Sequence, residues 1–201
     1  MKPHIVVLVL SIGAAGAYVA YRALDVDVAD DSETGPAAAA SSDSRLVDSL
    51  PHFVLDDLAG NPTPIESLAG KPLLLNFWAT WCAPCLREIP MLKAYQEANP
   101  DIQVVGIAID RVDPVLAFAE EMEFNYPVLV GPEAVNAAGA FGVDFVAMPF
   151  SVFAAAGGNV LGVHTGELHA EHLEQFDTVI ASLASGRIGI AAARAMLAGR
   201  M

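Results

Sequence analysis

Both cysteines of the chain, Cys82 and Cys85, lie two residues apart in the stretch FWATWCAPCLREIP, residues 77–90. Two thiols at this spacing can exchange with disulfides, bind copper(I) or form half of a zinc site. A purely structural disulfide closing so small a loop would remove little unfolded-state entropy. Redox exchange is therefore the favoured chemistry. A zinc site would need further ligands, and the candidates are histidines: His52, His164, His169 and His172.

The sequence around the pair favours Cys82 as the reactive thiol. The apolar run from Pro72 to Ala79 predicts a strand buried on both faces, and a helix is predicted from Ala83 to Ala98. Cys82 then lies where the helix begins, so unpaired N–H groups and the helix dipole stabilise its thiolate. Cys85, one turn further on, is expected to be more buried and to resolve a mixed disulfide formed at Cys82.

The rest of the chain must supply the elements that position this pair. The sequence predicts an alternation of strands and helices that closes with a hairpin and an amphipathic helix. This order predicts an α/β fold with a mixed central sheet flanked by helices. Asp113 and Pro114 are expected as the N-cap and first residue of one helix. The predicted strands cover residues 52–55, 102–109, 127–130, 149–154 and 160–165, and the remaining helices cover 113–124, 133–141 and 168–183.

The ends of the chain are expected to lie outside the main domain. Residues 1–24 include an uncharged stretch, 5–21, which predicts a membrane anchor through residues 5–24. A cleaved signal peptide and a buried core helix are the alternatives. The acidic residues 25–50 predict a flexible linker, and residues 51–186 the folded domain. Residues 187–201 predict a C-terminal helical extension that packs on the domain or lies on an anionic membrane surface.

The overall composition limits the possible partners. Of the 201 residues, 54% are hydrophobic and 17% are charged, which suits one domain of ordinary size. The formal net charge of −14 would repel a phosphate backbone, so no nucleic acid is expected as a partner. Solubility and an acidic linker explain the charge, and steering of a basic partner is the alternative.

The motif Trp81-Cys82-Ala83-Pro84-Cys85, after Leu75-Asn76-Phe77-Trp78, resembles the active site of the thioredoxin superfamily. More narrowly, it resembles membrane-anchored periplasmic thiol–disulfide oxidoreductases of the TlpA/ResA/DsbE type. The resemblance covers residues 51–183 and implies a thioredoxin fold with that subgroup's helix–strand insertion, here at residues 113–130. It also includes Gly70-Lys71-Pro72, Arg87-Glu88-Ile89-Pro90 and Gly142-Val143…Met148-Pro149.

The resemblance also implies roles for residues around the pair. Glu88 is implied to be an acid/base near the thiols, and burial would raise its pKa toward the working range. Asn76 stands where thioredoxins carry a buried aspartate, and an amide cannot take up a proton. Trp81 and Pro84 complete the immediate environment of the cysteines.

A substrate groove is implied at Met148 and Pro149. Pro149 is expected to follow a cis peptide bond and to face Cys82, where its ring would keep a metal out. Met148 would offer its backbone to an extended substrate peptide. Met148 and Phe150 depart from the residues usual in the family and suggest a more apolar groove, unless Phe150 belongs to the core. No cofactor and no resident metal is implied.

The resulting hypothesis is a protein-disulfide oxidoreductase that reduces particular disulfides of exported proteins. The implied substrates are apocytochrome c or a copper-site assembly protein, with electrons supplied by a membrane relay. The implied location is the periplasmic side of a bacterial inner membrane, or the soluble periplasm after signal cleavage. A copper(I) metallochaperone, disfavoured by the lack of Met- or His-rich tracts near the pair, and a thiol peroxidase are the alternatives.

Overall fold

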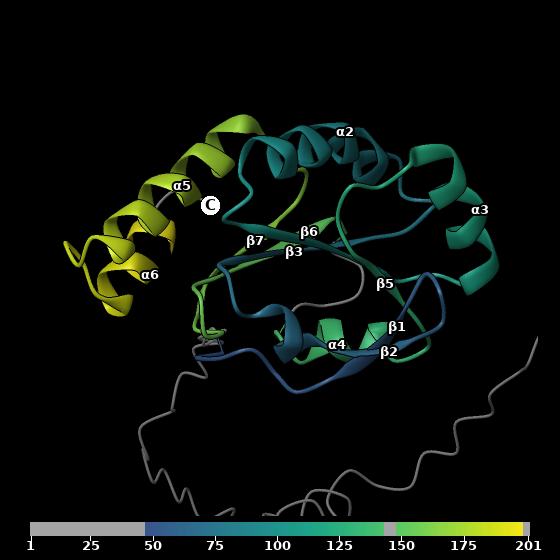
Figure 1. Ribbon diagram of the computed structural model, residues 1–201, viewed down its shortest axis with the longest axis horizontal. Coiled ribbons are helices and arrows are strands. Elements are labelled where there is room, and N and C mark those ends of the chain that lie inside the picture. The colour runs from purple at the N-terminus through teal and green to yellow at the C-terminus, as the bar shows by residue number, and fades with distance from the viewer. Residues whose placement is uncertain (1–46, 143–147, 199–201) are drawn as a thin grey trace, which may run out of the picture. The chain divides into compact units, whose positions relative to one another are not determined.

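A seven-stranded mixed sheet forms the centre of the computed structural model, which describes residues 47–142 and 148–198 (Figure 1). The predicted anchor, most of the predicted linker and Val143 lie outside the described residues. The strand order is β2-β1-β5-β4-β3-β6-β7. The strands are β1 (Val54–Asp57), β2 (Pro62–Pro64), β3 (Leu73–Trp78), β4 (Gln103–Ala108), β5 (Val128–Val130), β6 (Phe150–Ala154) and β7 (Val160–Thr165).

The three central strands, β3, β4 and β5, run parallel, and β1 and β6 pair antiparallel to them. The edge strands β2 and β7 pair antiparallel to β1 and β6. This arrangement confirms the predicted mixed sheet. The α3 and β5 elements provide the predicted helix–strand insertion. The helices are η1 (Ile65–Leu68), α2 (Ala83–Ala98), α3 (Val112–Met122), α4 (Ala134–Gly139), α5 (Ala170–Ala184) and α6 (Ile190–Ala198).

Helices cover both faces of the sheet, with α2 and α3 on one face and α4 on the other (Figure 1). The side chains of β3 alternate between two cores. Leu74 and Trp78 pack with residues of α2 and α5, whereas Leu75 and Phe77 pack with residues of α4. Every residue of β3 is therefore buried, which explains the uninterrupted apolar run before the cysteines. The strand carries one polar residue, Asn76, on the α2 face.

Helix α3 begins earlier than predicted. Its N-cap is Arg111, not Asp113, and Pro114 is the third helical residue. Proline is tolerated there because the first four N–H groups of a helix have no intrahelical partner. The helix ends at Met122, where Glu123 adopts a left-handed φ of 49°.

The folded domain begins before Pro51, so the last part of the predicted linker belongs to the domain. Leu50 N donates to Gly158 O at 2.9 Å, and Val160 N donates to Asp48 O at 3.2 Å. These bonds hold the segment against the β6–β7 turn. The turn needs glycine, since Gly157 and Gly158 adopt φ values of 83° and 84°.

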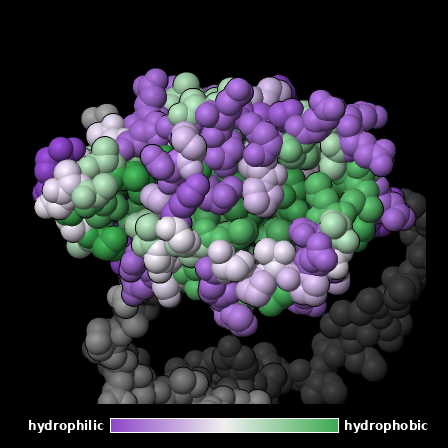
Figure 2. Space-filling model, viewed as in Figure 1, coloured by the Kyte–Doolittle hydropathy of each residue, from purple (hydrophilic) through white to green (hydrophobic). Residues whose placement is uncertain are grey.

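The C-terminal helix α6 packs on the domain, one of the two arrangements expected for this stretch. Ala193 and Leu197 are fully buried, and Arg194 Nε donates to Val160 O at 2.8 Å. On the face seen in Figure 2, hydrophilic side chains predominate and hydrophobic ones reach the surface near α6. Across residues 47–142 and 148–198, no helix combines the length and the apolar character needed to cross a membrane.

Candidate active site

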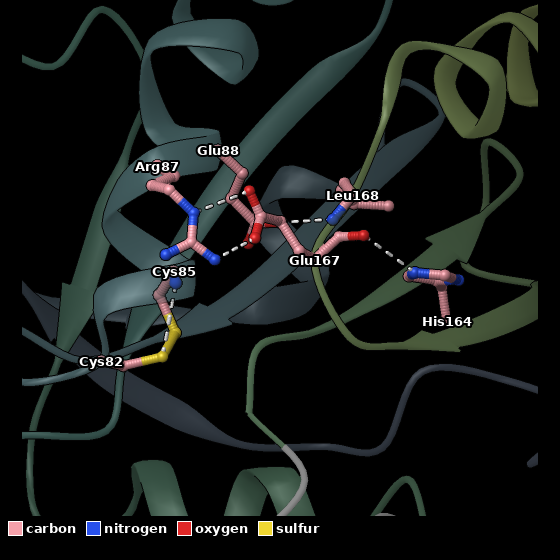
Figure 3. Close-up of polar contacts among 7 residues, drawn as sticks. All are labelled: Cys82, Cys85, Arg87, Glu88, His164, Glu167 and Leu168. Atoms are coloured by element: carbon pink, nitrogen blue, oxygen red, sulfur yellow. Dashed lines mark hydrogen bonds and ion pairs between the residues drawn. A yellow bond between two sulfur atoms is a disulfide. The ribbon is translucent and has the colours of Figure 1, made fainter.

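Cys82 and Cys85 form a disulfide at the N-terminus of α2 (Figure 3). Their Cα atoms are 5.3 Å apart. Cys82 is the N-cap residue, and its Sγ accepts a hydrogen bond from Cys85 N at 3.4 Å. Cys82 is 6% exposed and Cys85 is fully buried. The prediction that the second cysteine is the more buried one is therefore confirmed.

The loop that carries the pair is tied to the end of β4. Asp110 Oδ2 accepts hydrogen bonds from Thr80 N at 3.0 Å and from Thr80 Oγ1 at 2.5 Å. Cys82 N donates to Ala79 O at 3.1 Å. Asp110 was not predicted, although a signal existed: a carboxylate follows an apolar strand whose carboxyl end must lie beside that of the strand before the cysteines.

Glu88 lies one turn of α2 after Cys85, with only 2% of its surface exposed. Its Oε1 accepts from Asn76 Nδ2 at 2.6 Å, and its Oε2 accepts from Leu168 N at 2.6 Å. Burial raises the pKa of Glu88 to about 7, because desolvation of the carboxylate outweighs the two hydrogen bonds that favour it. The expected burial and raised pKa are both present.

Two further polar residues near Glu88 are Ser151 and Tyr126. Asn76 Nδ2 also donates to Ser151 Oγ at 3.1 Å, and both residues are fully buried. The pKa of Tyr126 is raised, first by its burial and then by the negative charge of Glu88. Neither residue was predicted: the signal for Ser151 is a lone polar residue in the apolar strand β6, and Tyr126 has no local signal.

The segment between β7 and α5 closes the site from the other side (Figure 3). Arg87 Nε donates to Glu167 Oε1 at 3.2 Å, and an Arg87 Nη2–Glu167 Oε2 contact of 2.5 Å completes a bidentate ion pair. The next residue, Leu168, supplies the N–H that Glu88 accepts. A main-chain donor leaves no mark on the sequence, so this contact was not predictable.

The Met148–Pro149 peptide bond is cis, as predicted. Pro149 is buried, and its carbonyl oxygen accepts from Gly166 N at 2.8 Å. Met148 is half-buried and packs against both cores. Phe150 belongs to the core, since it is fully buried and stacks on Phe77 with ring centroids 4.2 Å apart.

A cavity of about 500 Å³ opens beside Trp81, between the segment after β4 and the start of α4. Trp81 is 61% exposed, and Val112 and Val135 are also exposed on the rim of this cavity. Asp110 and Arg111 supply the charged part of its lining. The cavity was not predicted, because its walls come from three separate stretches of chain.

Three of the candidate zinc ligands lie near one another. The His164 and His172 rings have centroids 4.1 Å apart, and the His169 and His172 rings 5.8 Å apart. His52 instead pairs with Glu66, with Nδ1 2.5 Å from Oε1. Within the described parts of the chain, no three or more His, Cys, Asp or Glu side chains are grouped so that they could hold a metal ion.

A redox disulfide at the start of a helix, on a mixed sheet with helices on both faces, defines a thioredoxin-like thiol–disulfide oxidoreductase. The chain belongs to the redoxin family, whose model, described as "Redoxin", matches residues 46–180. The chain is similar to ResA, the thiol-disulfide oxidoreductase of Halalkalibacterium halodurans, with 29% identity over 140 residues. This match covers 68% of the chain and 78% of ResA.

Two solved structures are also similar. A DsbE-type thiol:disulfide interchange protein from Chlorobium tepidum is 26% identical with a TM-score of 0.61, over 67% of this chain and 96% of that one. A secreted Mycobacterium tuberculosis disulfide oxidoreductase, homologous to E. coli DsbE, is 28% identical with a TM-score of 0.51, over 66% and 95%. These likenesses confirm the predicted family, fold and enzyme class.

Proposed function

We propose that Cys82 is the attacking thiol and Cys85 the resolving thiol of this oxidoreductase. The observation that carries the assignment is the position of Cys82 at the N-cap of α2, with its sulfur accepting a helix N–H. A thiolate is stabilised there by the N–H group and by the helix dipole. Cys82 is also the more exposed of the two.

The exchange then takes two steps. The Cys82 thiolate attacks one sulfur of a substrate disulfide, a mixed disulfide forms, and the other substrate sulfur leaves as a thiolate that takes a proton from solvent. Cys85, having given its proton to the Glu88 carboxylate, attacks Sγ of Cys82. The Cys82–Cys85 disulfide forms and the second substrate thiolate leaves. The substrate gains the two electrons that the cysteine pair loses.

Glu88 is proposed as the proton acceptor for Cys85. Its position one turn after Cys85 supports this role, as does a pKa of about 7, at which the carboxyl group exchanges protons near neutral pH. Asn76 suits both protonation states of Glu88. Its amide N–H donates to the carboxylate, and after rotation its carbonyl oxygen would accept from the carboxylic acid, while the Ser151 hydroxyl reverses its role.

The substrate is proposed to be an extended segment of a protein, bound across Trp81, Met148 and Pro149. In this proposal, the exposed Trp81 and the cis Met148–Pro149 segment would form the two sides of the groove. The exposed Val112 and Val135 at the cavity beside Trp81 add apolar surface for substrate side chains. Trp81 and Pro84 would shape the entrance to the cysteine pair.

We propose that the enzyme acts as a reductant for disulfides of exported proteins, with apocytochrome c or a copper-site assembly protein as the substrate class. A membrane relay would return the electrons. The similarity to ResA and to a DsbE-type protein supports thiol–disulfide exchange, and the reducing direction is what the resemblance to TlpA/ResA/DsbE-type proteins implies. We expect the reduction potential of the Cys82–Cys85 couple to lie nearer to about −270 mV, as in thioredoxin, than to about −120 mV, as in DsbA.

The potential is measured by equilibrating the full-length chain with thioredoxin and with glutathione mixtures of known poise, then quantifying the reduced fraction by alkylation. The Cys82→Ala chain, which cannot form the disulfide, corrects for non-specific labelling. A potential near that of DsbA would mark an oxidant and contradict the proposed direction of electron flow.

The domain is proposed to lie on the periplasmic side of a bacterial inner membrane, held by residues 5–24. The secretion of the similar M. tuberculosis oxidoreductase supports export. With a reporter that is active only outside the cytoplasm fused to the C-terminus, we expect activity in the membrane fraction. Deletion of residues 1–24 is the control and should abolish it. An inactive reporter would contradict export, and a soluble active one would contradict the anchor in favour of a cleaved signal.

A further inference from the structure

The peptide group between Glu167 and Leu168 is hydrogen-bonded on both sides (Figure 3). Its N–H, from Leu168, donates to Glu88 Oε2 at 2.6 Å. Its carbonyl oxygen, from Glu167, lies 3.3 Å from Nε2 of His164. Because a carbonyl oxygen only accepts, Nε2 of His164 is the donor in this contact. One planar amide therefore connects an imidazole to the buried carboxyl group.

We propose that this peptide group couples His164 to Glu88, which makes His164 a positioning residue for the acid–base group of thiol–disulfide exchange. The inference rests on the proposed role of Glu88. Hydrogen bonds in a chain polarise one another. A donor on the Glu167 carbonyl strengthens the Leu168 N–H as a donor, and so favours the carboxylate of Glu88 over its acid.

Two features hold the three groups in place. The side chain of Glu167 is fixed by its bidentate pair with Arg87, the neighbour of Glu88 on α2. His164 lies on β7 directly across from Ser151 in the sheet register. The His164 imidazole is thus held by the sheet and the Glu88 carboxyl group by α2. The Glu167–Leu168 peptide group between them is hydrogen-bonded to both.

Several charged or titratable groups surround the hydrogen-bonded series from His164 to Glu88. They determine the protonation state of His164. Burial lowers the pKa of His164, and the neighbouring His172 and His169 lower it further. The pKa therefore lies below the ordinary 6.5, whereas that of Glu88 is about 7. The ring is neutral, with its proton on Nε2, while Glu88 titrates. The groups that act on His164 or Glu88 are Tyr126 before β5, Glu167, and His169 and His172 at the start of α5. Behind them, Arg87 of α2 pairs with Glu167, and Glu171 acts on His172.

The test is a pH titration of the Glu88 carboxyl carbon by NMR, in the oxidised full-length chain. His164→Leu removes the donor and should raise the pKa of Glu88 by about 0.2 to 0.6 of a pH unit, as expected for partial loss of polarisation along one hydrogen bond. The amide proton of Leu168 should move upfield in the same variant. His164→Gln, whose amide nitrogen can replace Nε2, should keep both values near those of the parent. The matched control is His52→Leu, because His52 is exposed and takes no part in the hydrogen bonds between His164 and Glu88.

Unchanged Glu88 and Leu168 signals in His164→Leu would overturn the inference. Equal shifts in the Leu and Gln variants would also overturn it, because they would point to lost ring packing. A further measurement holds even if His164→Leu does not fold. In Glu88→Gln, where the carboxyl group no longer titrates, the Leu168 amide should follow the titration of His164 below pH 6.5, and a flat signal would contradict the coupling.

Failure of the proposed function is distinguishable from failure of the inference. If the pKa of Glu88 moves in His164→Leu while the pH profile of mixed-disulfide resolution does not, the coupling stands and Glu88 is not the acid–base group. If the profile responds to Glu88→Gln while the pKa of Glu88 does not respond to His164→Leu, the role of Glu88 stands and the coupling is wrong.

Discussion

A chain carrying Cys85→Ala accumulates a covalent mixed disulfide through Cys82. Resolution in the parent uses a thiol held within the same helical turn, as the Cα separation of 5.3 Å shows. A thiol from solution must replace it in the variant and lacks the high effective molarity of an intramolecular group, so release should slow by at least about 10³-fold. The adduct is measured on non-reducing gels, and the linked substrate is identified by mass spectrometry.

Cys82→Ala is the matched control and should yield no adduct, because the remaining Cys85 is fully buried. Limiting alkylation of the reduced parent gives the same assignment independently, with the label predominantly on Cys82. Preferential labelling of Cys85, or an adduct of similar yield in Cys82→Ala, would reverse the roles of the two thiols.

The parts of this site that could be predicted are those with a local signal. The two cysteines before a helix and the apolar strand before them follow from spacing and periodicity along one segment, whereas the role of Glu88 one turn later was implied by the resemblance. The cis bond at Pro149 and the family followed from a resemblance carried by short motifs. The alternation of strands and helices was enough to predict a mixed sheet.

The contacts that were missed join residues far apart in the sequence or use the main chain. Leu168 reaches Glu88 through its backbone N–H, so the identity of its side chain carries no information about the bond. Ser151 and Asn76 meet because β6 pairs with β3, a register that only the assembled sheet defines. Asp110 approaches Thr80 for a similar reason, since parallel β3 and β4 end side by side.

Glu88 should contribute stability to the oxidised protein at low pH that is lost as pH rises. Its pKa is about 7 in the folded protein against 4.5 ordinarily. Between these values the folded protein holds a proton that the unfolded chain has lost, so the free energy of unfolding decreases through this window. The full effect is on the order of 3 kcal/mol, reached above pH 7. It should be absent in Glu88→Gln, which carries no ionisable group.

The glutamine can keep a hydrogen bond to both partners of the carboxylate, Leu168 N and the Asn76 side chain. Its carbonyl oxygen accepts from Leu168 N–H and its amide donates to Asn76, whose side-chain amide rotates to present oxygen to Ser151 as well. Denaturant unfolding at pH 5 and pH 8 measures the difference. Glu97→Gln, an exposed glutamate on the same helix, is the control and should keep the slope of the parent. The lowered pKa values of His164 and His172 add an opposite slope to both proteins, so the test is the difference between parent and variant, and equal pH dependence in the parent and Glu88→Gln would contradict the raised pKa.

In the reduced protein, Glu88→Gln should change the chemistry as well as the stability. An ionised carboxylate near a thiol disfavours a second negative charge, so its removal lowers the pKa of the nearer thiol. The same substitution removes the proton acceptor, so the step that resolves the mixed disulfide should slow by about 10²-fold or more at neutral pH. Easier ionisation of the thiol with slower resolution is a combination that lost packing does not produce.

The measurement is the pH dependence of thiol alkylation and of disulfide reduction in the variant, the parent and Glu97→Gln. Superimposable curves for all three would show that Glu88 takes no part in the exchange, whatever its pKa.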